Sequence, residues 1–462
     1  MAGLSSVLNT ARDALAASSF GLSVTGQNIA NASTPGYVRR EALLQTKALG
    51  SQTFGTVDVL GLRRATDMFS SRRLYESVGL GSAASEHQKQ LGMVESLFND
   101  FQGAGLADSI DQLFGSFSSL AANPSEPASR IGVLDRAAAF ASRANDTANA
   151  LGTQEQELLV QARETVAAAN ERAKDLARVE SQIAISRAGG GDAADLLEER
   201  EHLLRDLGEM IDIRVIENGD GGIVVQAAGS TLVEGSRANS LSVDLDADGK
   251  IRLWGTTAGG NATEITRYLN GGKLAGIKET RDVDIFNVKT KLDELVFGVA
   301  SAVNAQHAQG YGLDGQTGRD IFDLPPSAAD AARAIRISAD VVDQPDAVAA
   351  AGSAGSLPGG SDNAIELVRL GSAPILNGNT QSPGTAYGAI VADIGLRSRR
   401  AQDTAEHREA VHAQIETLFQ QQSGVSLDEE MVQLTKFQRA FEASSKVLTV
   451  VDQLLAELMQ AI

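Results

Sequence analysis

The chain of 462 residues lacks several residue types on which particular kinds of chemistry depend. It contains no cysteine, which excludes disulfide scaffolds, thiolate zinc sites and cysteine nucleophiles. Aromatic residues make up only 4% of the chain, and there is a single tryptophan. No run of about 18 apolar residues occurs, so no membrane span is expected. The first residues also lack the basic start and apolar run of a secretory signal, which by itself predicts a cytoplasmic protein.

Positive charge is also scarce. Forty Lys and Arg stand against 59 Asp and Glu, which gives a net charge of −19. This excess repels phosphate backbones and anionic lipids, so we expect no nucleic acid as a partner and no docking on a membrane. The composition that remains, rich in Ala, Leu, Gln, Glu and Arg, is typical of long packed helices.

Both ends of the chain carry apolar residues at alternating steps of four and three, the pattern of helices that pack against other helices. Residues 4–32 are free of proline, and residues 426–462 continue one stripe to the C-terminus. Ordering such a helix alone is marginal, so a partner surface is expected, either within one chain or in an assembly. The predicted assembly interface consists of Leu4, Leu8, Leu15, Leu22 and Ile29, and of Leu434, Phe441, Leu448 and Leu455. The C-terminal stripe also includes Met459 and Ile462.

Between these ends the pattern is first helical, then of period two, then helical again. Helices are predicted over 67–123, 127–187 and 193–210, separated by Asn123–Pro127 and Gly189–Gly191. A seam for helix packing is predicted at Ala162, Val166, Ala169, Ala173, Leu176, Val179 and Ile183. Residues 211–270 carry hairpin signals such as Asn218-Gly219 and Asp248-Gly249. Helices return over 276–306, 385–422 and 426–462, after a loop-rich stretch with a short strand near 334–338.

The predicted fold class is therefore mainly α with a small all-β domain, drawn out into an elongated multi-domain rod. The expected division has three parts. Residues 1–65 and 424–462 form a terminal, coiled-coil-like helical domain, and residues 66–210 and 271–423 form a helical bundle. Residues 211–270 form a small antiparallel β domain.

Candidate chemical sites are few. Asp244, Asp246 and Asp248-Gly249 match the first half of an EF-hand loop, but Gly255 stands where a bidentate Glu belongs. A polar hairpin turn is the better interpretation, and no metal or cofactor is expected. No catalytic motif of nucleotide-binding proteins or hydrolases occurs, so the chain is predicted not to be an enzyme. A basic cluster is interpreted as a solvated helix face, with a partner contact as the alternative: Arg397, Arg399 and Arg400.

Residues 27–39, Gln-Asn-Ile-Ala-Asn-Ala-Ser-Thr-Pro-Gly-Tyr-Val-Arg, resemble the N-terminal motif of flagellar rod, hook and hook-associated proteins. Residues 423–430 and 437–448 resemble the C-terminal helix of the same proteins, and residues 304–311 and 318–322 are similar to the hook-associated protein 1 (FlgK) family. The turn residues of the motif are Asn28, Asn31, Thr34, Pro35, Gly36 and Tyr37.

This resemblance implies a structural subunit of the bacterial flagellum, at the junction between hook and filament and required for filament assembly. The implied partners are further copies in a ring, the hook protein, the next hook-associated junction protein, and an export chaperone on the C-terminal helix. The family leaves the cell unfolded through type III export without a cleaved signal, which replaces the cytoplasmic expectation with an extracellular one. Another axial protein of the hook or rod is the alternative, and a flagellum-associated wall hydrolase is a more distant one. Larger relatives carry an outermost domain, for which residues 323–338 leave no room.

Overall fold

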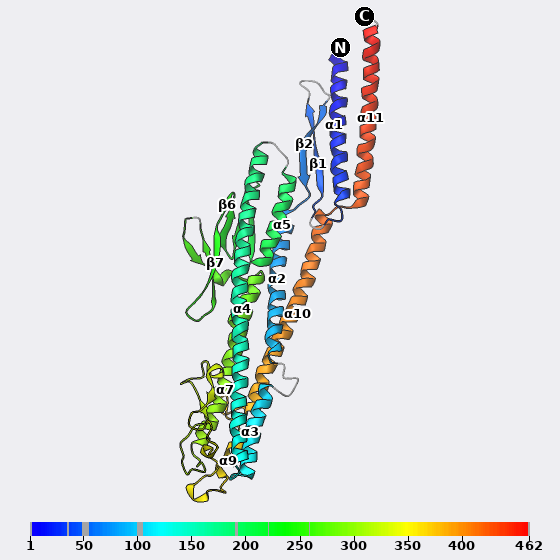
Figure 1. Ribbon diagram of the computed structural model, residues 1–462. Coiled ribbons are helices and arrows are strands. Elements are labelled where there is room, and N and C mark those ends of the chain that lie inside the picture. Colours follow the sequence, from blue (N-terminus) through cyan, green and yellow to red (C-terminus); the bar gives the residue numbers. More distant parts are fainter. Residues whose placement is uncertain are drawn as a thin grey trace.

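The computed structural model describes residues 2–34, 37–48, 55–98, 105–189, 193–219, 221–257 and 259–460. The molecule is an elongated, mainly helical rod, and the two ends of the chain lie side by side at one end of it (Figure 1). The predicted fold class, mainly α with small antiparallel sheets, is confirmed.

Two terminal helices and one hairpin form what we call the terminal module. Its elements are α1 (Ala2–Ala30), β1 (Arg40–Ala48), β2 (Gly55–Arg64) and α11 (Leu427–Gln460). The hairpin pairs Leu43 with Gly61 and Leu44 with Val59, which leaves Leu60 as a β-bulge. It lies along α1, and α11 runs antiparallel on another side of that helix (Figure 1).

The middle of the rod is a bundle of long helices. They are α2 (Met68–Ser96), α3 (Leu106–Ala122), α4 (Pro127–Ala188), α5 (Ala194–Met210) and α10 (Pro383–Ser423). α4 has 62 residues, a length of about 93 Å. Local sequence explains the helix starts: the side chain of Asp67 accepts a hydrogen bond from Phe69 N, and Pro127 and Pro383 occupy first-turn positions.

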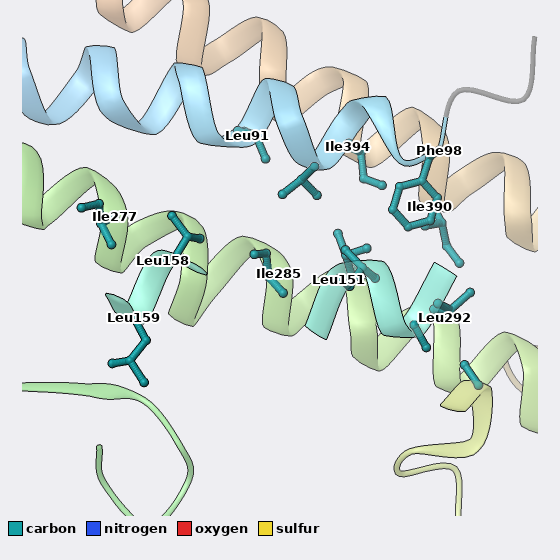
Figure 2. Close-up of a cluster of buried hydrophobic side chains, with 14 of the residues drawn as sticks. Leu91, Phe98, Leu151, Leu158, Leu159, Ile277, Ile285, Leu292, Ile390 and Ile394 are labelled. Carbon is teal, nitrogen blue, oxygen red and sulfur yellow. The ribbon is translucent and has the colours of Figure 1, made fainter. Parts of the chain in front are cut away.

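The core of the bundle follows α4. The predicted seam is confirmed, because all seven of its residues from Ala162 to Ile183 are buried. Figure 2 shows Leu151 and Leu158 of α4 facing Leu91 of α2, with Ile285 and Ile390 closing the same layer. Many of the buried α4 residues are alanine, which allows neighbouring helices to approach closely. In α5, by contrast, the residues Leu196, Leu203 and Met210 are only half-buried.

Two small sheets lie against the side of α4. The first has the order β3 (Ile213–Glu217), β4 (Ile223–Ala227), β5 (Ser230–Glu234), β6 (Arg237–Ala238). The second has the order β7 (Ser240–Leu245), β8 (Ile251–Thr256), β9 (Ala262–Glu264). Burial alternates along β4 and β8, as the period-two pattern requires. The predicted hairpins after β3 and β7 are both present.

A π-helical turn connects the sheets to the bundle. The chain runs from η1 (Thr266–Tyr268) into α6 (Lys273–Glu279), η2 (Thr280–Ile285) and α7 (Phe286–His307) without a break after α6. The buried Arg281 donates to the Gly249 carbonyl at 2.7 Å, and Asp282 accepts from the Ile251 N–H at 3.0 Å. Both bonds hold the β7–β8 hairpin against the helix.

Contacts at the same π turn contradict the prediction that Arg397 lies on a solvated helix face. Asp284 accepts hydrogen bonds from Arg397 at 3.0 Å and lies 2.8 Å from His87 Nε2. Arg397 also donates to Asp393, so its guanidinium is not the solvated group that the sequence suggested. α10 packs against α7 here, which places Arg397 beside a buried carboxylate. The other two residues of that cluster are exposed: Arg399 and Arg400.

The far end of the rod is built from loops and short elements. They are β10 (Phe322–Asp323), α8 (Ala331–Ala334), β11 (Arg336–Ile337), η3 (Pro345–Ala347), η4 (Ala354–Ser356) and α9 (Asp362–Leu370). β10 pairs directly with β11, and only α8 intervenes between them. The sequence pattern did not predict α9, a helix of nine residues.

Candidate assembly interface

Asn28, near the C-terminal end of α1, is the polar centre of the terminal module. It is 1% exposed. Its Nδ2 donates to the Arg40 carbonyl at 2.8 Å and to Glu430 Oε2 at 3.1 Å. Its Oδ1 accepts from the Tyr37 hydroxyl and from the Arg40 N–H, both at 3.0 Å. The amide therefore uses its full hydrogen-bonding capacity to join α1, β1 and α11.

The turn after α1 brings Tyr37 to Asn28. Asn31 Nδ2 donates to the Gln27 carbonyl at 3.0 Å, and Thr34 N–H donates to the Asn31 carbonyl at 2.9 Å. Tyr37 N–H then donates to the Thr34 carbonyl at 3.1 Å. Burial raises the pKa of Tyr37, so its hydroxyl stays protonated and donates to Asn28. Two residues of the predicted motif lie outside the described residues: Pro35 and Gly36.

Charge pairs attach the hairpin to α11. The guanidinium of Arg39 lies 2.8 Å from Glu429 and 3.3 Å from Glu430. Glu430 is buried, so its carboxylate is held between Arg39 and Asn28. A buried carboxylate is stable only with such partners.

Further charge pairs attach the hairpin to α5 of the bundle. Arg40 donates to Asp195 at 2.7 Å and to Glu198 at 2.9 Å, and Arg64 lies 3.6 Å from Glu201. The joint between the terminal module and the bundle is therefore largely polar.

Helix α1 packs against both α11 and the hairpin. Its buried residues include Ala11, Ala17, Ser18, Val24 and Thr25. On the side that α11 covers, a Cβ atom at Gly21 would lie 2.5 Å from the ring of Phe437, so a larger residue there would force this ring to move. We call the contact between α1 and α11 the inner face of each helix.

The predicted interface residues of α11 lie on its inner face. Leu434, Phe441, Leu448 and Leu455 follow Glu430 at helical spacing and so share its side of the helix. Leu434 and Leu448 are half-buried, whereas Phe441 and Leu455 remain 37% and 38% exposed. The side chain of Met459 and all of Ile462 lie outside the described residues.

The predicted residues of α1 lie along one edge of its inner face. Leu8, Leu15, Leu22 and Ile29 are all half-buried. The side chain of Leu4 lies outside those that the structure describes. Whether these residues contact other subunits stays a prediction.

α11 carries a second apolar side that the sequence reasoning missed. Val450 follows Leu448 by two positions and so lies about 200° round the helix from it, away from α1. We call four residues on this side the outer row: Val432, Val447, Val450 and Leu454, which are 67%, 43%, 53% and 45% exposed. Val447, Val450 and Leu454 are three and four positions apart, which in a sequence indicates a second apolar side of the helix. This side lies outside the single heptad stripe that was predicted. Val447, Val450 and Leu454 lie within about two turns of one another, whereas Lys436 and Arg439 separate Val432 from them on the same side. Exposed apolar residues that are grouped in this way mark an interaction surface.

Other candidate sites resolve into structural contacts. Asp246 Oδ1 accepts from the N–H groups of Asp248 and Lys250, and Asp244 accepts from Arg252 and from Trp254 Nε1. These carboxylates therefore hold the β7–β8 hairpin together. Within the described ranges, no group of three or more His, Cys, Asp or Glu is placed to hold a metal ion. No helix in the described part of the chain has the length and hydrophobicity needed to span a membrane.

One serine and one histidine meet beside a cavity with a volume of 580 Å³. Ser77 Oγ lies 3.0 Å from His412 Nδ1, but its own proton goes to the Leu74 carbonyl at 2.8 Å. His412 therefore donates to the hydroxyl and does not act as its base in this arrangement.

An elongated helical rod whose paired ends expose an apolar side belongs to the class of assembly subunits. The protein-family model described as "Flagellar hook-associated protein FlgK helical domain" matches residues 91–322, half of the chain. Two descriptions of flagellar rod proteins match the ends, "Flagella basal body rod protein" at residues 8–37 and "Flagellar basal body rod FlgEFG protein C-terminal" at residues 419–461. The chain belongs to the flagellar hook-associated protein 1 (FlgK) family.

Curated relatives agree with this membership. The flagellar hook-associated protein 1 of Salmonella typhimurium is 28% identical over 355 residues, which cover 74% of this chain and 64% of the relative. The protein of the same name from Bacillus subtilis is 26% identical, over 97% of this chain and 96% of its own length. The match thus spans less than two thirds of the Salmonella protein.

A solved structure shares the fold. The flagellar hook junction protein FlgK of Burkholderia pseudomallei superposes with a TM-score of 0.69 at 16% identity. The superposition covers 77% of this chain and all of that one.

Proposed function

We propose that this chain is a structural subunit of the bacterial flagellum that forms the junction between hook and filament and is required for filament assembly. Family membership and the names of the relatives support this role. The observation that carries it is α11, whose inner face meets α1 while its outer row is exposed. A helix with apolar residues on two sides has one side free for another molecule.

The partners we propose are further copies in a ring, the hook protein and the next hook-associated junction protein. An export chaperone would cover α11 before assembly, because exposed apolar helices aggregate. Helix-in-groove binding would suit either apolar side of α11.

The proposed location is the flagellum outside the cell, reached by type III export without a cleaved signal. A chain that is exported unfolded gains from having no cysteine, since no disulfide can trap it. The proposed role is mechanical and not enzymatic, and a peptidoglycan-hydrolysis assay tests the wall-hydrolase alternative.

The alternative is a rod or hook subunit. One observation favours it, because family models of flagellar rod proteins match both ends of the chain. The middle of the chain favours the junction instead, since the FlgK helical domain matches there.

Electron microscopy of a deletion strain separates these roles. Loss of a junction subunit should leave hooks without filaments, and restoring the full chain should restore filaments and swimming. Loss of a rod or hook subunit should instead leave no complete hook, and that result would contradict the proposal.

A further inference from the structure

Two short links join the terminal module to the bundle (Figure 1). Residues 65–67 lead from β2 to α2, and residues 424–426 lead from α10 to α11. Each link is three residues long and lies outside the helices and strands. Links of this kind leave two units free to change their relative orientation unless side chains hold them.

The apolar contact at this joint is small. Val38, which precedes β1, packs with Leu74 of α2 and Phe419 of α10 in a cluster separate from the main core. Beside this cluster the Arg39 N–H donates to the Ser423 carbonyl at 2.9 Å. We call this contact the pivot. It fixes a point of attachment but not an angle, because the hydrophobic effect has no direction.

Arg40 supplies the missing direction. Its main chain belongs to the polar centre of the terminal module, where its N–H and its carbonyl both bond to Asn28. Its guanidinium lies 5.4 Å from the centroid of the Tyr37 ring and donates to Asp195 at 2.7 Å and to Glu198 at 2.9 Å on α5. One residue therefore connects the geometry of the terminal module to that of the bundle.

Arg64, which pairs with Arg40 across the hairpin, makes a weaker contact with α5. Its guanidinium lies 3.6 Å from Glu201, a carboxylate that also accepts a hydrogen bond from the hydroxyl of Tyr75 on α2. The Arg64 side chain is 7% exposed, yet its Nη2 has no hydrogen-bond partner among the described residues. An unsatisfied buried donor carries a desolvation cost, so the pairs of Arg40 dominate this joint.

We infer that the charge pairs of Arg40 form a latch that sets the orientation of the terminal module, and that the module turns on the pivot when these pairs are lost. The inference goes beyond the proposed role and holds for the single chain. Because the side chain of Asp195 is 90% exposed, dissolved ions reach the latch, and salt should weaken it.

Pulsed double electron–electron resonance on the full chain measures this orientation. Spin labels at the exposed positions Gln45→Cys of β1 and Gln182→Cys of α4 report the distance between module and bundle, and no native cysteine competes for the label. We expect a narrow distance distribution in the otherwise native chain. Arg40→Gln should widen it about twofold, and so should Asp195→Asn combined with Glu198→Gln, which removes the pairs from the other side of the joint. High salt should widen the distribution of the native chain more than that of either variant.

Arg63→Gln is the matched control. It removes the same charge from the same hairpin, where Arg63 pairs with Glu41 at 2.5 Å, and should leave the distribution narrow. A broad distribution in the native chain, a narrow one in both latch variants, or equal widening by Arg63→Gln would each overturn the latch. Faster amide exchange at residue 40 in the α5 double variant would show that the module unfolds instead of turning, which would also contradict it.

Discussion

At the residue scale, Asn28 shows why a short motif can govern a large contact. Its single amide satisfies four hydrogen bonds to Arg40, Tyr37 and Glu430. A buried amide with all partners present stabilises one arrangement and penalises others. The motif therefore fixes the geometry in which α1, the hairpin and α11 meet.

The substitution Asn28→Asp should weaken the contact between α1, the hairpin and α11. The carboxylate replaces an N–H donor with an acceptor that faces the Arg40 carbonyl and the Glu430 carboxylate. The cost is about 2–4 kcal/mol, since buried groups lose partners and like charges meet. Amide exchange at Arg40, whose N–H donates to Asn28, should accelerate at least tenfold. Asn9→Asp, at an exposed position of the same helix, is the matched control and should change nothing. Unchanged exchange at Arg40 would show that Asn28 does not govern the contact.

The buried His307, at the far end of the rod, should make the stability of the fold depend on pH. Its Nε2 accepts from the Ala349 N–H at 2.8 Å, so Nδ1 carries the proton and donates to the Arg319 carbonyl at 2.7 Å. Burial lowers the pKa of His307 from its ordinary value of 6.5 to about 4. Between these values the unfolded chain takes up a proton that the folded chain does not, so stability falls as pH falls from 6.5 to 4. The loss is about 3 kcal/mol at most and is complete below pH 4.

Unfolding by urea across this pH range measures that loss. The difference between the native chain and His307→Gln isolates the histidine, because other groups contribute equally to both. We expect the native chain to lose more stability than the variant between pH 6.5 and 4. Parallel curves would show that His307 does not titrate in this way.

At the element scale, α11 is the least supported long helix. Among its described side chains only Glu430 and Val451 are buried, although the helix has 34 residues. Ordering each residue costs about 1–2 kcal/mol of backbone entropy, which so little burial offsets poorly. α4 shows the opposite case, with a buried seam along its length.

Amide exchange in the isolated chain should reflect this difference. We expect most of α11 to exchange much faster than α4, with protection only near Glu430, where Asn28 and Arg39 bind it. Comparing α11 with α4 in one sample provides an internal control. Equal protection along both helices would refute the expectation.

Elements of this kind also show what the sequence can predict. α1, α4 and α11 followed from apolar periodicity, and the β7–β8 hairpin followed from Asp248-Gly249, because these signals are local. Arg397 was misjudged because its partner Asp284 lies 113 residues away on another element. The polar centre at Asn28 could be recognised as a motif, but its bond to Glu430 spans 402 residues, and no local pattern encodes it.

At the scale of the whole molecule, different kinds of contact stabilise the bundle and join the terminal module to it. The bundle is held by a continuous apolar core, whereas charge pairs from Arg40 and Arg64 tie the terminal module to α5. A small apolar cluster of Val38, Leu74 and Phe419 lies at the same joint. Changes within the terminal module should therefore leave the bundle folded.

Two matched double variants use this division to separate the faces of α11. Leu448→Asp with Leu455→Asp charges the inner face, so it should detach α11 from α1 and weaken both chaperone binding and junction assembly. Val450→Asp with Leu454→Asp charges the outer row, so it should reduce assembly while the helices stay paired. Each buried apolar side chain is worth about 1.5–3 kcal/mol, so either pair should weaken assembly at least a hundredfold. Circular dichroism should show the bundle still folded. A disulfide engineered between Ala14→Cys of α1 and Ser444→Cys of α11, two half-buried positions on the inner faces, should close within one chain only in the outer-row variant. If both double variants assemble and support swimming, neither face of α11 is the interface.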